Sequence, residues 1–154
     1  MESGKAAIIG GLIAGLVTTG VMIAGRKSGL LGKTLDRDSV DWIDRNTGSR
    51  QLIGDTGTSL VEFANHLGAS AAFGYGYSRL RKAAPGVPGP ILGAGYGTVL
   101  YLVNIAGIAP LLGITEGERR AGPRKAAERW GVHVLQTVVT AIVADRLSSR
   151  RTGA

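Results

Sequence analysis

Residues 6–25 read AAIIGGLIAGLVTTGVMIAG, a run of twenty residues without a charge or a proline. Lys5 precedes this run, and Arg26 and Lys27 follow it directly. A helix rises about 1.5 Å per residue, so the run would be about 30 Å long, the thickness of a bilayer's hydrocarbon core. Its length and the basic pair that ends it favour a retained membrane span over a cleaved signal peptide.

Three further stretches repeat this pattern of an apolar run with basic flanks. Charged residues make up only 19% of the 154 residues, and they fall in blocks between the runs instead of recurring along helix faces. The sequence therefore predicts an all-α fold, a four-span transmembrane helix bundle in a single membrane domain, residues 1–154. The expected spans are residues 6–25, 59–80, 90–107 and 124–147, and residues 26–58 form a polar, amphipathic connection.

The composition excludes several classes of function. The net charge is +7, but the basic residues form no single stripe that would follow a nucleic-acid backbone. They stand at the ends of apolar runs, the pattern expected beside lipid headgroups. The chain has no cysteine, which excludes a disulfide, a thiol nucleophile and a thiolate metal ligand. We therefore expect the lipid bilayer as a partner and no nucleic acid.

Local signals place the start of the second span and divide the connection before it. Ser59 and Glu62 have the spacing of a capping box, which predicts that the second span begins at Ser59. In the connection, apolar and acidic residues alternate around Trp42. Two interpretations fit this alternation: a short helix capped by Asp38 and lying on the membrane, or an ordered surface loop.

A weak internal repeat relates the two halves of the chain. Aligning His66 with His133 also aligns Arg79 with Arg146, and the first span resembles the third in its small residues. Two tandem helical hairpins would produce this pattern, because membrane folds often contain such repeats. Chance similarity between two helices rich in glycine and alanine explains the match equally well.

Small residues recur at every fourth position in three spans, which predicts flat faces where neighbouring helices pack closely. Packing within one chain is the favoured interpretation, and oligomerisation through one strip is the alternative. The predicted helix-packing residues are Gly11 and Gly15 in the first span, Gly68, Ala72 and Gly76 in the second, and Gly89, Gly93 and Gly97 in the third.

Several of these segments resemble a known family. They are Asn65-His66-Leu67-Gly68, residues 71–76 (AAFGYG), residues 93–97 (GAGYG), residues 109–113 (APLLG) and His133. Together they resemble the YagU-like family of small bacterial inner-membrane proteins, which has no established activity. The resemblance implies a multi-pass protein of the bacterial inner (plasma) membrane. The chain departs from the family in Gln136-Thr137, where a Tyr-Gly or Trp-Gly pair is usual, and in its acidic residues 36–44.

Among the polar residues inside the expected spans, the candidate site residues are His66, Asn104 and His133. Polar groups at membrane depth usually form hydrogen bonds between helices, and Asn65, Ser70, Gln136 or Thr137 are the expected partners. Two alternatives remain for the histidines. They could carry protons, because imidazole titrates near neutral pH, or they could ligate a haem between the second and fourth spans.

No catalytic motif stands out, so we expect no enzymatic activity, no cofactor and no metal site. Asp55, Thr56 and Gly57 match an aspartic-protease signature in letters, but that chemistry needs two such carboxylates. The favoured function is a structural or accessory component that packs with itself or with a larger membrane complex. The alternative is a small transporter, channel or proton-linked stress-response protein that uses His66 and His133.

Overall fold

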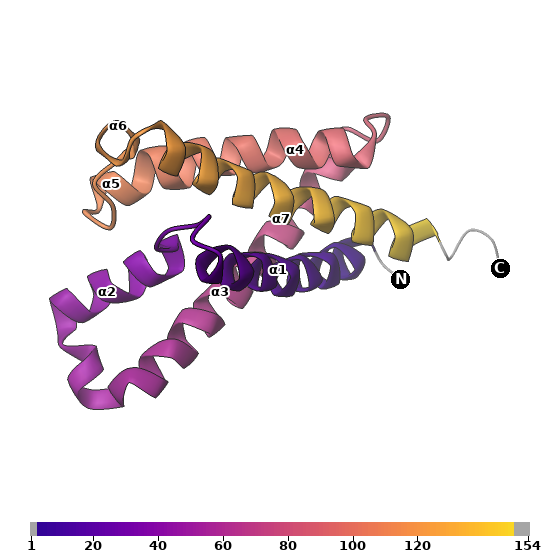
Figure 1. The fold of residues 1–154 in the computed structure, drawn as a ribbon. Coiled ribbons are helices and arrows are strands. Elements are labelled where there is room, and N and C mark those ends of the chain that lie inside the picture. The colour runs from indigo at the N-terminus through magenta and orange to yellow at the C-terminus, as the bar shows by residue number, and fades with distance from the viewer. Residues whose placement is uncertain (1–2, 150–154) are drawn as a thin grey trace.

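The computed structural model describes residues 3–149, and these residues form a bundle of helices without a strand (Figure 1). The predicted all-α class is confirmed. In chain order the helices are α1 (Ser3–Lys27), α2 (Leu35–Thr47), α3 (Ser49–Ala83), α4 (Gly89–Leu100), η1 (Tyr101–Ile108), α5 (Ala109–Leu111), α6 (Glu118–Ala121) and α7 (Pro123–Ser149).

Two helical stretches are long and apolar enough to cross a membrane by length and composition. One is α1, and the other is the continuous stretch Gly89–Leu111, which comprises α4, η1 and α5. Within residues 3–149, α3 and α7 do not meet the same criterion. Both extend past their expected apolar cores into charged segments, so the number of spans is not confirmed.

The second long helix begins much earlier than its predicted capping box. Helix α3 starts at Ser49, so Ser59 lies inside the helix, and the prediction of a helix start at Ser59 is wrong. The chain bends instead at Gly54, where φ is 67° and ψ is −179°. Glycine adopts this backbone conformation without a steric penalty. The bend gives α3 a short polar arm, which together with α2 forms the elbow of residues 35–57.

Of the two interpretations of the connection, the short helix is the one that forms. Helix α2 carries Trp42, but its cap is Thr34 and not Asp38. The hydroxyl oxygen of Thr34 accepts a hydrogen bond from the backbone N–H of Arg37 at 3.4 Å. Gly48 ends the helix in the left-handed conformation, as glycine commonly does.

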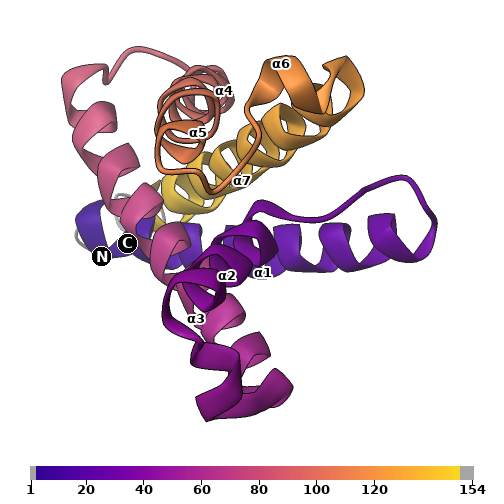
Figure 2. The same cartoon turned by 90° about the vertical axis from the view of Figure 1, so that its left-hand side faces the viewer.

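Helices α1 and α7 form the centre of the bundle, α3 packs against α1, and α4 packs against α7 (Figures 1 and 2). Residue 3 of α1 and residue 149 of α7 lie at the same end of the bundle, and α2 and α6 lie at the other. The elbow projects from this second end, where it contacts α3.

Glycines set the close approach of α1 to both of its neighbours. A Cβ added to Gly10 would lie 2.8 Å from the carbonyl oxygen of Thr140 on α7, too close for any real side chain. On the other side of α1, a Cβ on Gly11 would collide with the carbonyl oxygen of Ser70 on α3. A Cβ on Gly15 would lie 2.6 Å from the Ser70 hydroxyl oxygen. The backbones of α1, α3 and α7 are therefore in near contact.

A second glycine seam joins α4 to α7. A Cβ on Gly93 would lie 2.8 Å from the carbonyl oxygen of Thr137, and one on Gly97 would collide with the Thr137 hydroxyl. Gly89 faces the carboxylate of Asp145 in the same way. These three predicted packing residues lie buried along one face of α4.

The small residues of α3 are arranged differently from the expectation. Gly68 and Ala72 are exposed, and a Cβ on Gly68 would meet no heavy atom within 4 Å. Gly76 faces the hydroxyl of Tyr96 on α4. The residue of α3 that approaches α1 is Gly74, which contacts the backbone of Ala7. Of the three, Gly76 thus faces another helix of the chain, whereas Gly68 and Ala72 lie on the exposed surface of α3.

Candidate functional site: a histidine-lined cavity

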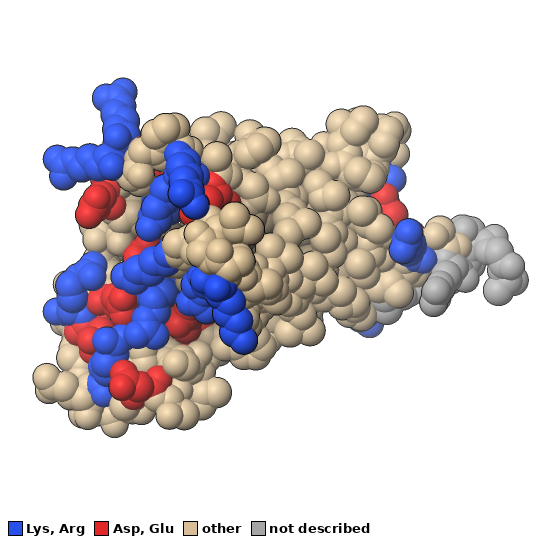
Figure 3. Space-filling model, viewed as in Figure 1, with Lys and Arg blue, Asp and Glu red and all other residues tan. Residues whose placement is uncertain are grey.

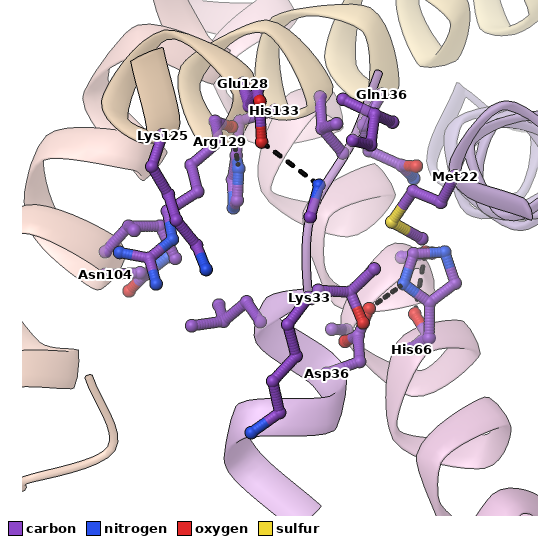
Figure 4. Close-up of a pocket in the computed structure, with 18 of the residues that line it drawn as sticks. Met22, Lys33, Asp36, His66, Asn104, Lys125, Glu128, Arg129, His133 and Gln136 are labelled. Carbon is purple, nitrogen blue, oxygen red and sulfur yellow. Dashed lines mark hydrogen bonds and ion pairs between the residues drawn. The ribbon is translucent and has the colours of Figure 1, made fainter. Parts of the chain in front are cut away.

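The three polar residues predicted inside the spans, His66, Asn104 and His133, line one cavity (Figure 4). The cavity has a volume of about 320 Å³, and α1, α2, α3, η1 and α7 all contribute to its wall. Apolar side chains such as Phe73 and Ile105 form most of the remaining surface. A polar group on a bound molecule would therefore meet a few defined partners within an apolar chamber.

His66 joins three helices through its ring. Its Nε2 atom lies 3.0 Å from the carbonyl oxygen of Gly15 and 3.3 Å from the hydroxyl oxygen of Thr18, both on α1. Its Nδ1 atom lies 3.0 Å from a carboxylate oxygen of Asp36 on α2. Both nitrogens thus face oxygen acceptors, an arrangement that the doubly protonated ring satisfies completely. The interhelical partners are Gly15, Thr18 and Asp36, and not the residues expected from the sequence.

A buried hydrogen-bond network extends this link to α7. The Thr18 hydroxyl donates to the side-chain carbonyl of Gln136 at 2.7 Å, and the Gln136 amide donates to the Gly11 carbonyl at 3.1 Å. Gln136 lines the cavity, and one turn further along α7 the helices α1 and α7 meet at Gly10 and Thr140. The cavity therefore does not continue between α1 and α7 as a path to the opposite end of the bundle.

His133 has a different environment from His66. Its Nδ1 atom lies 2.8 Å from the carbonyl oxygen of Arg129 in the same helix, so this nitrogen carries the proton and donates. The rings of Phe73 and Tyr101 both lie with their centres 6.4 Å from the centre of the imidazole. Nε2 has no hydrogen-bond partner among the described residues, which leaves an acceptor for a bound molecule.

Asn104 reaches the cavity from an unusual helical segment. Segment η1 is π-helical, and the backbone N–H of Ala109 donates to the carbonyl of Asn104, five residues earlier. Pro110 follows directly and has no N–H to donate, which favours a local departure from the α-helical pattern. Short π-helical segments occur frequently at functional sites because they redirect side chains.

Charged residues surround the end of the cavity nearest α2 and the start of α7. Glu128 accepts a hydrogen bond from the backbone N–H of Gly32 at 3.3 Å, which holds the chain between α1 and α2 against α7. Arg129 is only 10% exposed and pairs with Glu118 at 2.8 Å and Asp38 at 3.4 Å. Lys125 also lines the cavity and has no ion-pair partner among residues 3–149.

Helix α2 adds a network of ion pairs at this end. The ammonium of Lys33 lies 2.8 Å from both Asp38 and Asp41. Hydrogen bonds to these two carboxylates raise the pKa of Lys33 above its usual value, and the hydrogen bond from Lys33 lowers the pKa of Asp41. Because the pKa of Asp41 is lower in the folded protein, its contribution to stability is present above its unfolded pKa, near 4. That contribution is lost as the pH falls through the lowered value.

We expect Asp41→Asn to reduce stability by about 1 kcal/mol at neutral pH, because the substitution removes a carboxylate from a charge network. At lower pH the variant and the unmodified protein should differ less, because the contribution of Asp41 to stability is lost as the pH falls through its lowered folded-state pKa. Thermal unfolding of both proteins in detergent, followed from pH 3 to 7, measures this difference in stability. Asp55→Asn is the control, since Asp55 is 90% exposed and meets only Arg50 at 3.5 Å. An equal loss of stability in Asp41→Asn and Asp55→Asn would contradict the role of Asp41 in the charge network.

The arrangement does not favour a haem or a metal ion. Axial ligation needs a free nitrogen lone pair on each histidine, and both nitrogens of His66 are already directed at oxygen acceptors. Within residues 3–149 no group of three His, Asp or Glu residues has the geometry to hold a metal ion. His133 alone retains a nitrogen acceptor at the cavity.

Sequence reasoning missed Asp36 and Arg129 as members of this site. Asp36 was one of several acidic residues in a connection whose path was unknown, and Arg129 was one of the basic residues flanking a span. Sequence spacing could identify neither, because their partners are far away in the sequence. Asp36 pairs with His66, 30 residues away, and Arg129 pairs with Asp38, 91 residues away.

Comparisons with protein-family models, with curated proteins and with solved structures find no match for this chain, so the resemblance to the YagU-like family stays a prediction.

Proposed function

We propose that this chain is a four-span protein of the bacterial inner membrane that binds a small amphipathic molecule in the histidine-lined cavity. The sequence alone favours an accessory role over a transporter or proton-linked role. The cavity changes that order, because it gathers the intramembrane polar residues around a space large enough for a small molecule. The proposed function is therefore closer to that of a transporter than to that of an accessory protein, although the cavity forms no continuous channel.

The distribution of charge supports four spans. On the face seen in Figure 3, charged residues gather over α2, α6 and the start of α7, and a broad uncharged band covers the middle of the bundle. The uncharged parts of α3 and α7, residues 63–78 and 130–144, would be about 24 and 22 Å long as helices, shorter than the hydrocarbon core of about 30 Å. As spans, they would need the long charged side chains at their ends to extend towards the headgroups. Large apolar side chains are exposed along this band, as expected for surfaces that face lipid. Leu16, Ile91, Val99 and Leu102 are each more than half exposed.

Single cysteines test the number of spans, because the natural chain has none. Ser28→Cys and Glu116→Cys should be labelled by a membrane-impermeant maleimide from one side of the membrane, and Ala84→Cys from the other. The reason is that one span, α3, lies between Ser28 and Ala84, and one span, Gly89–Leu111, lies between Ala84 and Glu116. Labelling of all three from the same side would contradict the four-span arrangement.

The cavity itself carries the proposal of ligand binding. His133 contributes an unoccupied acceptor, Asn104 contributes an amide, and Phe73 and Ile105 contribute apolar surface. Because the space closes beyond Gln136, a bound molecule would enter from the charged end or from the lipid and leave the same way. A molecule with an apolar body and one hydrogen-bonding head fits this chemistry.

Filling the cavity tests ligand binding. Ala69 lines the cavity, and Ala69→Phe should displace a molecule that co-purifies with the natural protein. Ala72→Phe is the matched control, because Ala72 is exposed like Ala69 and lies on the same helix, but it is not part of the cavity wall. Organic extraction and mass spectrometry should find a small molecule with the unmodified protein and the control, and not with Ala69→Phe. Identical extracts from all three would argue against the proposal.

The exposed strip on α3 favours a second candidate function, the accessory role. Gly68 and Ala72 present small residues on the outer surface of a long helix, where another helix could approach closely. A second copy of the chain or a subunit of a larger complex would use this face. Gly68→Leu should then remove the partner from the protein purified in mild detergent, while binding in the cavity persists.

A further inference from the structure

A second cavity lies beside the first, at the charged end of the bundle. Its volume is about 540 Å³, and it lies among α2, the segment that follows α5, α6 and the start of α7. Cationic side chains dominate its wall: Lys33, Arg45, Arg120, Lys125 and Arg129 line it, against the carboxylates of Asp38 and Glu116. Lys33, Lys125 and Arg129 stand between the two cavities and line both.

The described protein neutralises only part of the positive charge of this cavity. Lys33 pairs with Asp38 and Asp41, and Arg129 pairs with Glu118 and Asp38. Arg45, Arg120 and Lys125 line the cavity without an ion-pair partner among residues 3–149. Clustered cations repel one another, so this arrangement favours an anion between them.

Two buried polar atoms at the cavity also lack partners. Nε of Arg129 and the hydroxyl oxygen of Thr115 are both buried, and neither has a hydrogen-bond partner in the described structure. The Arg129 side chain is 10% exposed, and its two terminal nitrogens are occupied by Glu118 and Asp38. Buried polar groups without a partner are rare and costly in proteins, because they lose their hydrogen bonds to water. Both residues contribute to the cavity wall, but these two atoms are buried behind it and are not donors to a bound molecule.

We infer that this second cavity binds a phosphate group. A phosphate presents several acceptor oxygens and up to two negative charges, so it can engage guanidinium groups and an ammonium at once. Arg45, Arg120 and Lys125 supply both the charge and the hydrogen-bond donors. The phosphate comes either from the headgroup of an anionic lipid or from a soluble phosphorylated molecule. This inference does not depend on the proposed function of the histidine-lined cavity.

The experiment uses the full chain in nanodiscs and follows its thermal unfolding. In discs of phosphatidylcholine, sodium phosphate is compared with sodium chloride at equal ionic strength. In parallel, discs of phosphatidylcholine alone are compared with discs that contain phosphatidylglycerol. A rise in the unfolding temperature with phosphate identifies a soluble source, and a rise with phosphatidylglycerol alone identifies a lipid headgroup. No rise with either probe would overturn the inference.

Variants assign the response to this cavity. Arg120→Gln should weaken binding about tenfold or more, the usual effect of removing one charge-assisted hydrogen bond. Arg119→Gln is the matched control, because Arg119 is exposed, carries the same charge and is not part of the cavity wall. Equal responses in Arg120→Gln and Arg119→Gln would overturn the inference.

Discussion

Replacing Arg129 with glutamine should destabilise the bundle by about 3 kcal/mol, because the substitution removes the cation from a buried ion-pair cluster. Arg129 is 10% exposed, and it connects Glu118 of α6 to Asp38 of α2 through α7. Glutamine is too short to reach both carboxylates and carries no charge. Glu118 would keep only the hydrogen bond from the Tyr101 hydroxyl, at 3.0 Å.

The control for this prediction is Arg124→Gln in the same helix. Arg124 is 76% exposed, and it pairs with Glu128 four residues later at 3.3 Å. Exposed pairs of this kind contribute about 0.3–0.5 kcal/mol, so Arg124→Gln should barely change thermal unfolding in detergent. If the two variants unfold at the same temperature, the buried cluster does not hold α2, α6 and α7 together.

Gly93→Leu should cost about 1–3 kcal/mol through overpacking of the seam between α4 and α7. A Cβ at this position would lie 2.8 Å from the Thr137 carbonyl oxygen and 3.0 Å from the Cα atom of Val138. These are backbone atoms, so the two helices would have to move apart. The loss should appear as a lower unfolding temperature in detergent.

Gly95→Leu is the matched control, two residues away in the same helix. A Cβ on Gly95 would meet no heavy atom within 4 Å. Its replacement should leave stability unchanged or raise it slightly, because leucine favours the helical conformation by about 1 kcal/mol over glycine. A loss in Gly95→Leu as large as in Gly93→Leu would show that leucine at any glycine of α4 is harmful, and that the seam is not the cause.

The positions of the long helices could be predicted from the sequence because their apolar runs are interrupted only near the ends. The start of α3 could not, since residues 49–58 are polar and carry no helical periodicity of apolar residues. The letters of Ser59 and Glu62 matched a capping box, but the helix already existed at that point. A capping signal predicts a helix start only where the preceding residues are not helical.

The packing face of α3 shows why periodicity alone is insufficient. Small residues recur every four positions on two faces of this helix. One face includes Gly68 and Ala72, and the other includes Ser70 and Gly74. Spacing is equal on both faces, so it cannot tell which one meets α1. The structure buries Ser70 and Gly74, where side chain and backbone contact α1 directly.

The candidate site, like the fold, could be predicted from the sequence only in part. His66, Asn104 and His133 could be identified from the sequence because a polar residue in an apolar run is costly unless it has a partner. The partner of His66 on α2 could not be identified, because it depends on how the connection between α1 and α3 folds back. Asp36 reaches His66 only because α2 forms and returns along α3.

The pairing of α1 with α7 has a consequence for how the protein is made. A ribosome completes α1 first and α7 last, so the first helix spends nearly the whole of synthesis without one of its two main neighbours. Until α7 arrives, Thr18 lacks Gln136, and the glycine face of α1 around Gly10 has no helix to meet. A nascent chain that stops before α7 would therefore leave this face of α1 uncovered, and the stability of the bundle would develop late, when α7 joins the other helices.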